Sequence, residues 1–224
     1  MSEPDIATSV AFVPVMRTDV TFVRPARGTR RAAPVWLARR VGRLPDADAL
    51  ERAREKTIPD VLPGPGDPPL RVLFCGINPG LVSAATGHHF ARPGNRFWPV
   101  LHESGFTPRL LRPDEQGELA GLGLGITNMA PRATARADEL TDDELVAGGE
   151  RLRALVAERR PGRLAVVGIG AYRTAFGRRV ASVGEQDGRV GQATVWVLPN
   201  PSGLNAHWSR EAMVAEFARL RARS

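Results

Sequence analysis

Short apolar runs alternate with longer amphipathic stretches over most of the chain after residue 70, and this alternation limits the possible folds more than any other feature. The apolar runs are residues 71–77, 122–127, 164–167 and 194–198. Helical periodicity follows each of them, near residues 95–104, 141–160, 171–180 and 209–221. Continuous apolar strands separated by helices indicate a parallel sheet that is buried on both faces. We therefore expect an α/β three-layer sandwich, with a short, mostly parallel sheet of four or five strands and helices on both faces.

The N-terminal part of the chain differs in composition from the rest. Residues 1–45 contain eight arginines and three acidic residues, a net charge of +5, and no core periodicity. A basic, disordered N-terminal arm is predicted there. Residues 46–69 are predicted to form a short charged helix and a Pro/Gly-rich linker. The folded domain is expected to span residues 70–224.

Composition excludes several classes of protein. The single cysteine, Cys75, rules out an internal disulfide framework, a Cys-rich zinc site and a four-cysteine iron–sulfur cluster. No apolar run approaches the roughly 20 residues of a membrane helix, and acidic residues stand near the N-terminus where a secretory signal would be basic. We expect a cytoplasmic protein with no membrane partner and no metal. The net charge of +7, taken alone, favours a solvated surface over a nucleic-acid-binding one.

Asparagine, glycine and proline recur directly after the predicted strands. The strands lead into residues 76–80 (GINPG), 128–132 (NMAPR), 168–170 (GIG) and 199–205 (PNPSGLN). The carboxyl ends of parallel strands lie at one edge of a sheet, where ligands bind in such folds. Glycine allows close backbone approach, and the asparagine carboxamide offers both a donor and an acceptor. This edge is predicted to read a neutral heterocycle such as a nucleobase, although ordinary turn chemistry explains either asparagine motif alone.

Aromatic residues crowd the segment after the first motif. Phe90 lies in a predicted loop between Gly87 and Gly94, and is the best candidate to stack on a base taken out of a duplex. Phe97 and Trp98 stand early in a predicted helix and are expected to be core residues.

Five ordered segments together resemble the mismatch-specific uracil-DNA glycosylases, a family that includes thymine-DNA glycosylase. They are GINPG at 76–80, GHHF at 87–90, PGNRFW at 93–98, TNMAPRAT at 127–134 and LPNPSGLN at 198–205. The resemblance runs from about Thr57 to the C-terminus and leaves residues 1–45 outside. It implies a uracil-DNA glycosylase-like fold and a monomer that acts on double-stranded DNA with G:U or G:T mismatches, associated with the nucleoid through DNA.

The implied reaction is hydrolysis of the N-glycosidic bond of uracil, with thymine or alkylated cytosine as alternative bases. It leaves an abasic site in base excision repair and needs no cofactor. Asn78 would position the water that attacks C1′, by orientation rather than proton abstraction, because a carboxamide is a poor base. Phe90 would stack on the flipped base, and Ser83 lies where the family tunes access for the thymine methyl. The residues implied to form the base pocket are Gly76, Ile77, Pro79, Gly80, Ser83, His89, Phe90, Asn95 and Asn128.

The last motif is implied to enter the DNA. Leu204 would be the wedge that fills the vacated stack, and its neighbours would contact the mismatch. This group comprises Asn200, Pro201, Ser202, Gly203, Leu204 and Asn205. Four arginines that flank the motifs are predicted phosphate contacts, with solvated surface as the alternative: Arg92, Arg96, Arg132 and Arg210.

Other features narrow the mechanism and leave the base preference open. Lys56, the only lysine, precedes the catalytic motifs, so a Schiff-base mechanism is not expected and the enzyme should be monofunctional. Relatives with Asp in the first motif work faster, which implies slow turnover here. Asn205 differs from many bacterial members, whereas His89 and Asn128 resemble the thymine-DNA branch. The alternatives are another branch of the superfamily, or a non-catalytic module that binds damaged DNA.

The basic arm predicts a measurable electrostatic effect. Deletion of residues 1–45 removes a net charge of +5 and should lower non-specific affinity for duplex DNA and flatten its dependence on salt, because fewer counterions are released. The measurement is the dissociation constant over a salt series for the full-length and truncated proteins. An unchanged salt slope would show that the arm does not contact DNA.

Overall fold

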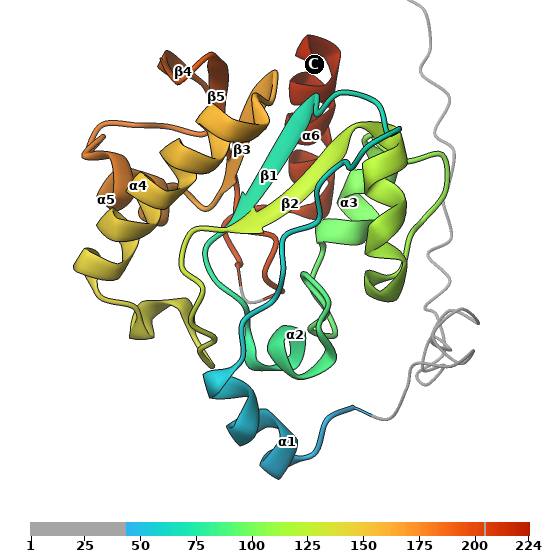
Figure 1. Cartoon of the computed structure of the whole chain (residues 1–224), viewed down its shortest axis with the longest axis vertical. Coiled ribbons are helices and arrows are strands. Elements are labelled where there is room, and N and C mark those ends of the chain that lie inside the picture. Colours follow the sequence, from blue (N-terminus) through green and yellow to red (C-terminus); the bar gives the residue numbers. More distant parts are fainter. Residues whose placement is uncertain (1–43, 204) are drawn as a thin grey trace, which may run out of the picture. The chain divides into compact units, whose positions relative to one another are not determined.

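A single sheet organises the domain, with its strands in the order β2-β1-β3-β5-β4 (Figure 1). The computed structural model describes residues 44–203 and 205–224, so the predicted arm lies almost wholly outside the described residues. The parallel strands are β1 (Val72–Gly76), β2 (Leu124–Asn128), β3 (Arg163–Val167) and β5 (Ala193–Leu198). The edge strand β4 (Gly184–Val190) pairs antiparallel with β5. The predicted mostly parallel sheet is confirmed, and β4 is the strand that the sequence did not predict.

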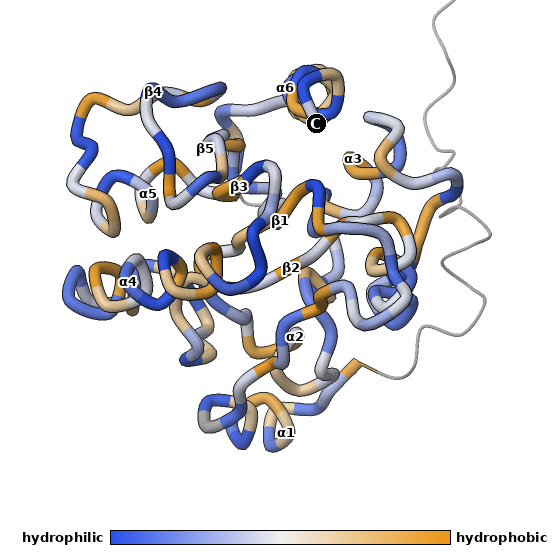
Figure 2. The backbone as a smooth tube through the Cα atoms, turned by 45° about the horizontal axis from the view of Figure 1, so that its top comes forward, coloured by the Kyte–Doolittle hydropathy of each residue, from blue (hydrophilic) through white to orange (hydrophobic). Residues whose placement is uncertain are grey.

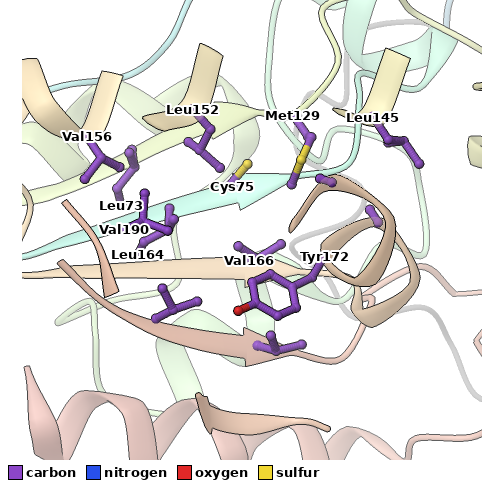
Figure 3. Packing of buried hydrophobic residues seen from close by; sticks show 14 of the residues in the cluster. Leu73, Cys75, Met129, Leu145, Leu152, Val156, Leu164, Val166, Tyr172 and Val190 are labelled. Atoms are coloured by element: carbon purple, nitrogen blue, oxygen red, sulfur yellow. The ribbon is translucent and has the colours of Figure 1, made fainter. Parts of the chain in front are cut away.

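Helices cover both faces of this sheet, as the three-layer prediction requires. α4 (Asp142–Arg159) and α5 (Ile169–Phe176) pack on one face, and α3 (Phe97–Glu103) and α6 (Arg210–Arg223) pack on the other (Figure 1). Successive strand residues point to opposite faces. In β1, Leu73 and Cys75 therefore join the α4 and α5 side of the core (Figure 3), whereas Phe74 packs against Phe97 and Phe217 on the other side.

Helix α4 shows how the sequence sets an element and its ends. Hydrophobic and hydrophilic stretches both occur along its length (Figure 2), and the buried residues recur every three or four positions, at Leu145, Gly148, Leu152 and Val156, which gives the helix one buried face. Thr141 and Glu144 form a capping box at its start, and Arg160 adopts a left-handed conformation at its end with φ of 50°. The helix predicted at 141–160 is thus confirmed.

Three short elements escaped the sequence analysis, and the last of them is the 3₁₀ turn η4 (Ala137–Glu139). α2 (Leu81–Thr86) has six residues and ends at Gly87, which has a left-handed φ of 77°. η3 (Pro113–Leu122) is a 3₁₀ segment that begins with proline. α2 and η4 are too short to show clear helical periodicity. η3 is longer, but it has three residues per turn and buries only Leu119, so it has no apolar face with the period of an α-helix. No helix within residues 44–203 and 205–224 has the length and apolar character needed to cross a membrane.

The folded domain begins well before Leu70, which corrects the predicted boundary. α1 (Ala47–Arg52) and η2 (Ala53–Glu55) form the predicted short helix, but they pack on the domain: Ala53 is fully buried with Ala84 and Ala133. Val61 exchanges two backbone hydrogen bonds with Ile126 of β2, at 2.9 and 2.8 Å. The prediction was wrong because this segment contributes single buried residues rather than a periodic apolar face.

A close contact between α4 and the end of β2 predicts a cost for adding one methyl group. A Cβ on Gly148 would lie 2.4 Å from the Met129 carbonyl oxygen, so Gly148→Ala should destabilise the protein by about 1–3 kcal/mol through overpacking. Gly170→Ala is the matched control: nothing lies within 4 Å of its added Cβ, and it should be neutral or stabilising by up to about 1 kcal/mol. Urea unfolding measures both, and equal effects would contradict the steric argument.

Candidate active site

The turns after β1 and β2 lie side by side because their backbones are hydrogen-bonded beyond the last strand pair. The amide of Met129 donates to the Gly76 carbonyl, and the amide of Ala130 to the Ile77 carbonyl, both at 2.8 Å. Further along, the amide of Thr134 donates to the Pro79 carbonyl at 3.1 Å. The segment 76–80 is therefore held against the segment 128–134.

Asn78 is oriented by this arrangement. Its Nδ2 donates to the Arg132 carbonyl at 2.9 Å and to the Thr134 hydroxyl at 2.7 Å. The Thr134 hydroxyl in turn donates to the Arg136 carbonyl at 2.7 Å. Both amide hydrogens of Asn78 are thus used, and within the described residues its Oδ1 accepts no hydrogen bond. The side chain presents an acceptor to the cleft.

The segment that orients Asn78 is itself anchored to the start of α4. The Arg132 guanidinium donates to the two carboxylate oxygens of Glu144 at 2.6 and 3.0 Å, and to the Glu139 carbonyl at 2.9 Å. The bond from Arg132, together with the Thr141 backbone amide, lowers the pKa of Glu144 to about 2. From the next turns of the helix, Arg151 donates to the carbonyls of Asn128 and Met129 at 2.8 and 2.5 Å.

A second hydrogen-bonded chain orients Asn128. The Pro59 carbonyl lies 3.0 Å from Nε2 of His89, and since a carbonyl can only accept, Nε2 carries the proton. The other ring nitrogen is then the acceptor for Nδ2 of Asn128, at 3.3 Å. Burial lowers the pKa of His89, whose side chain is neutral and almost wholly enclosed. The side-chain oxygen of Asn128, Oδ1, is consequently the group turned toward Gly76 and the cleft.

Phe90 lies above Gly76 in a conformation that costs backbone energy. Its φ of 54° is left-handed, which is uncommon for a bulky residue. One face of its ring stacks on Phe97, with centroids 4.0 Å apart and an interplanar angle of 17°. A Cβ on Gly76 would lie 3.3 Å from the Phe90 ring and 2.6 Å from the Asn128 oxygen. Glycine at position 76 therefore keeps the space beneath these two side chains open. Phe97 and Trp98 are buried, as expected of core residues.

The turn after β5 approaches the same edge of the sheet. Asn200 caps it locally, because its Oδ1 accepts from the Ser202 amide at 3.0 Å, and Nδ2 of Asn205 donates to the Asn200 carbonyl at 2.9 Å. Gly203 lies against Gly94, whose carbonyl oxygen would be 2.7 Å from an added Cβ. Leu204, the predicted wedge, lies outside the described residues.

These segments enclose a cleft of about 580 Å³ at the carboxyl edge of the sheet. Most of the polar side chains that line it are neutral, and the charged ones are Arg92, Arg136 and Asp138. Asp138 is paired with Arg136, whose hydrogen bond lowers the pKa of the carboxyl group. The predicted residues that line the cleft are Ile77, Asn78, Pro79, Gly80, Ser83, His89, Phe90, Arg92, Asn95, Asn128, Asn200, Pro201 and Ser202. No group of His, Cys, Asp and Glu in the described part of the chain is arranged to hold a metal ion.

The four arginines predicted to contact phosphate have different surroundings. Arg132 is paired with Glu144, and Arg210 is paired with Glu103. The guanidinium of Arg96 is engaged by three backbone carbonyls. Arg92 is exposed at the cleft.

Several cleft residues were missed by the sequence analysis. Thr134 holds Asn78, and the only signal for it was its place at the end of the TNMAPRAT motif. Ile58 lines the cleft from the segment taken as a linker, and residues 135–138 line it as well. None of these residues follows a strand directly. The expectation that site residues stand at the carboxyl ends of strands therefore did not predict them.

The Arg132–Glu144 pair predicts an acid-dependent stability. A carboxyl group whose pKa is about 2 in the folded protein stabilises the fold above its ordinary pKa of roughly 4.3 and loses that effect as pH falls toward about 2. Glu144→Gln should therefore be less stable than the parent at pH 7, with a difference that shrinks at pH 3. Glu150→Gln, which removes an exposed pair with Arg153, is the control and should have little effect. Urea unfolding at both pH values gives the comparison, and a difference that does not change with pH would contradict it.

The comparison with protein families agrees with the fold. A model described as the uracil DNA glycosylase superfamily matches residues 63–221, well over half of the chain. That range contains the three asparagine-bearing turns, after β1, β2 and β5, and all five strands of the described sheet. The chain therefore belongs to the uracil DNA glycosylase superfamily, and its activity is that of a DNA-repair hydrolase that cleaves glycosidic bonds.

Proposed function

We propose that the protein is a monofunctional glycosylase that removes uracil mispaired with guanine from double-stranded DNA and leaves an abasic site. The observation that carries this proposal is the convergence of three polar turns, after β1, β2 and β5, on one cleft of about 580 Å³. The cleft has room for an extruded nucleotide and a mostly neutral polar lining, as a neutral pyrimidine requires. Thymine and alkylated cytosine are further candidate substrates.

Recognition of the base is assigned to Asn128 and Phe90. The hydrogen-bonded chain from Pro59 through His89 directs the side-chain oxygen of Asn128 toward the cleft. There it can accept a hydrogen bond from the imide N–H of a pyrimidine. The exposed part of the Phe90 ring offers a stacking surface for the flipped base, while its other face is held by Phe97. Ser83 is buried beside them, with its Oγ accepting from the Ala91 amide at 3.0 Å, and is proposed to limit the space near the 5-position of the base.

Bond cleavage is assigned to orientation and electrostatics rather than to a strong base. Asn78 keeps its Oδ1 toward the cleft because Arg132 and Thr134 occupy its amide hydrogens. We propose that this oxygen accepts a hydrogen bond from the attacking water and aligns it with C1′, as the base departs as an anion. Among the described residues, Asp138 is the one carboxylate that lines the cleft, and it is paired with Arg136. Slow turnover is the expected consequence of such a mechanism.

The turn after β5 is proposed to enter the duplex beside the lesion. Asn200 is assigned to the DNA backbone near the uracil, Leu204 to the gap left in the stack, and Asn205 to the unpaired guanine. Arg92 is exposed at the mouth of the cleft, and is the arginine whose surroundings best suit a phosphate contact.

The direct test uses an end-labelled duplex that contains one G:U pair. Incubation with excess protein followed by hot alkali should cleave the strand at the uracil, and omission of alkali should leave the strand intact because the enzyme is monofunctional. A parallel A:U duplex and a G:T duplex rank the substrates. Absence of cleavage at uracil in every duplex would overturn the proposed function.

The role of Asn78 predicts a specific loss of chemistry. Asn78→Ala should lower the single-turnover rate of uracil excision by at least about a hundredfold, because the water is no longer oriented, while affinity for the G:U duplex changes little. Filter binding and thermal unfolding on the same preparation serve as controls. A variant that retained the parental excision rate would rule out the assigned role.

A further inference from the structure

The guanidinium of Arg96 is already hydrogen-bonded within the protein, unlike that of an arginine that is free to bind phosphate. Arg96 precedes α3, and its side chain is only partly exposed. Nη1 donates to the Trp208 carbonyl at 2.7 Å, and Nη2 donates to the carbonyls of Ser202 and Asn205, both at 2.9 Å. One guanidinium thus bonds three carbonyls spread over seven residues of the turn after β5.

The backbone around Arg96 is attached to the same turn. The amide of Arg96 donates to the Pro201 carbonyl at 2.9 Å, and Gly203 is packed against the carbonyl of Gly94. The segment before α3 therefore follows the turn along its length. The turn has little backbone hydrogen bonding of its own. Among residues 200–203 and 205–208, one main-chain hydrogen bond is described, from the Asn205 amide to the Ser202 carbonyl at 3.0 Å.

The chemistry of these bonds requires a guanidinium. Three carbonyls that face one point need several donors with fixed directions, and the planar fork of arginine supplies them. A lysine ammonium carries the same charge as a compact point on a flexible stem, so it would not be expected to span all three carbonyls. The Nε atom of Arg96 is buried without a partner among the described residues, which further separates this side chain from solvent-exposed phosphate-binding arginines.

We propose that Arg96 is a positioning residue that holds the described part of the turn after β5, residues 200–203 and 205–208, in the shape needed to engage duplex DNA. The inference rests on the proposed function and concerns how that turn is maintained. Arg96 acts through the turn and does not contact the DNA backbone. Substitution of Arg96 should therefore impair extrusion of the base from the stacked duplex. It should leave the number of phosphate contacts, and so the salt dependence of DNA binding, unchanged.

The experiment compares two substrates and two kinds of substitution. Single-turnover excision is measured for uracil in a G:U duplex and for uracil in the centre of a three-nucleotide bubble, where no stack has to be opened. Arg96→Met removes the donors, and Arg96→Lys keeps the charge in case the Met variant does not fold. Arg159→Met removes one positive charge at the far end of α4, where Arg159 is paired with Glu158, and is the control for net charge. The salt dependence of duplex binding is measured for all four proteins.

The expected result is a fall in duplex excision at least tenfold larger than the fall in bubble excision for Arg96→Met. Arg96→Lys should also lose more duplex excision than bubble excision. The salt dependence of duplex binding should be the same in both Arg96 variants as in Arg159→Met. Equal losses on both substrates, full duplex activity in Arg96→Lys, or a salt slope lower by about one phosphate contact would overturn the proposal. Failure of the unaltered protein to excise uracil from either substrate would instead overturn the proposed function.

Discussion

The hydrogen bonds between the turns that follow β1 and β2 are the constraint on which the site depends. In the parallel register Gly76 lies beside Asn128, and the amides of Met129, Ala130 and Thr134 continue the pairing beyond the sheet. This extension brings the Thr134 hydroxyl to Asn78 and leaves the Asn78 oxygen toward the cleft. The relative position of the two turns is therefore set by main-chain bonds, and the side-chain bond from Asn78 to Thr134 then fixes the orientation of the carboxamide.

Charge is arranged around the cleft so that its interior stays mostly neutral. The guanidinium groups of Arg96 and Arg132 are turned to carbonyls and to a carboxylate, and the buried imidazole of His89 is uncharged. A neutral base can enter such a site without an unpaired charge having to lose its water. The same arrangement makes α4 important to the site, because Glu144 and Arg151 both hold the segment that carries Asn128 and Arg132.

Sequence reasoning reached most of the sheet and most of the cleft, for a physical reason. Apolar runs report burial on both faces, so β1, β2, β3 and β5 were predictable, and the residues after them lie at one edge by topology. Strand β4, with the sequence GEQDGRV, has an exposed face, two glycines and an irregular register with β5, so it has no apolar run. The partners of the arginines were beyond prediction because a sequence shows that a charge is present but not which carbonyl or carboxylate it meets in the fold.

The carbonyl of Pro59 that holds His89 has an implication for how this family of sites changes over time. Every amino acid supplies a backbone carbonyl, so replacement of the residue at this position need not disturb the imidazole. An insertion or deletion between Pro59 and Val61, which is hydrogen-bonded to Ile126, would shift that carbonyl out of reach. Selection on this part of the chain would then act on spacing rather than on residue identity, and a comparison of residue types alone would overlook it.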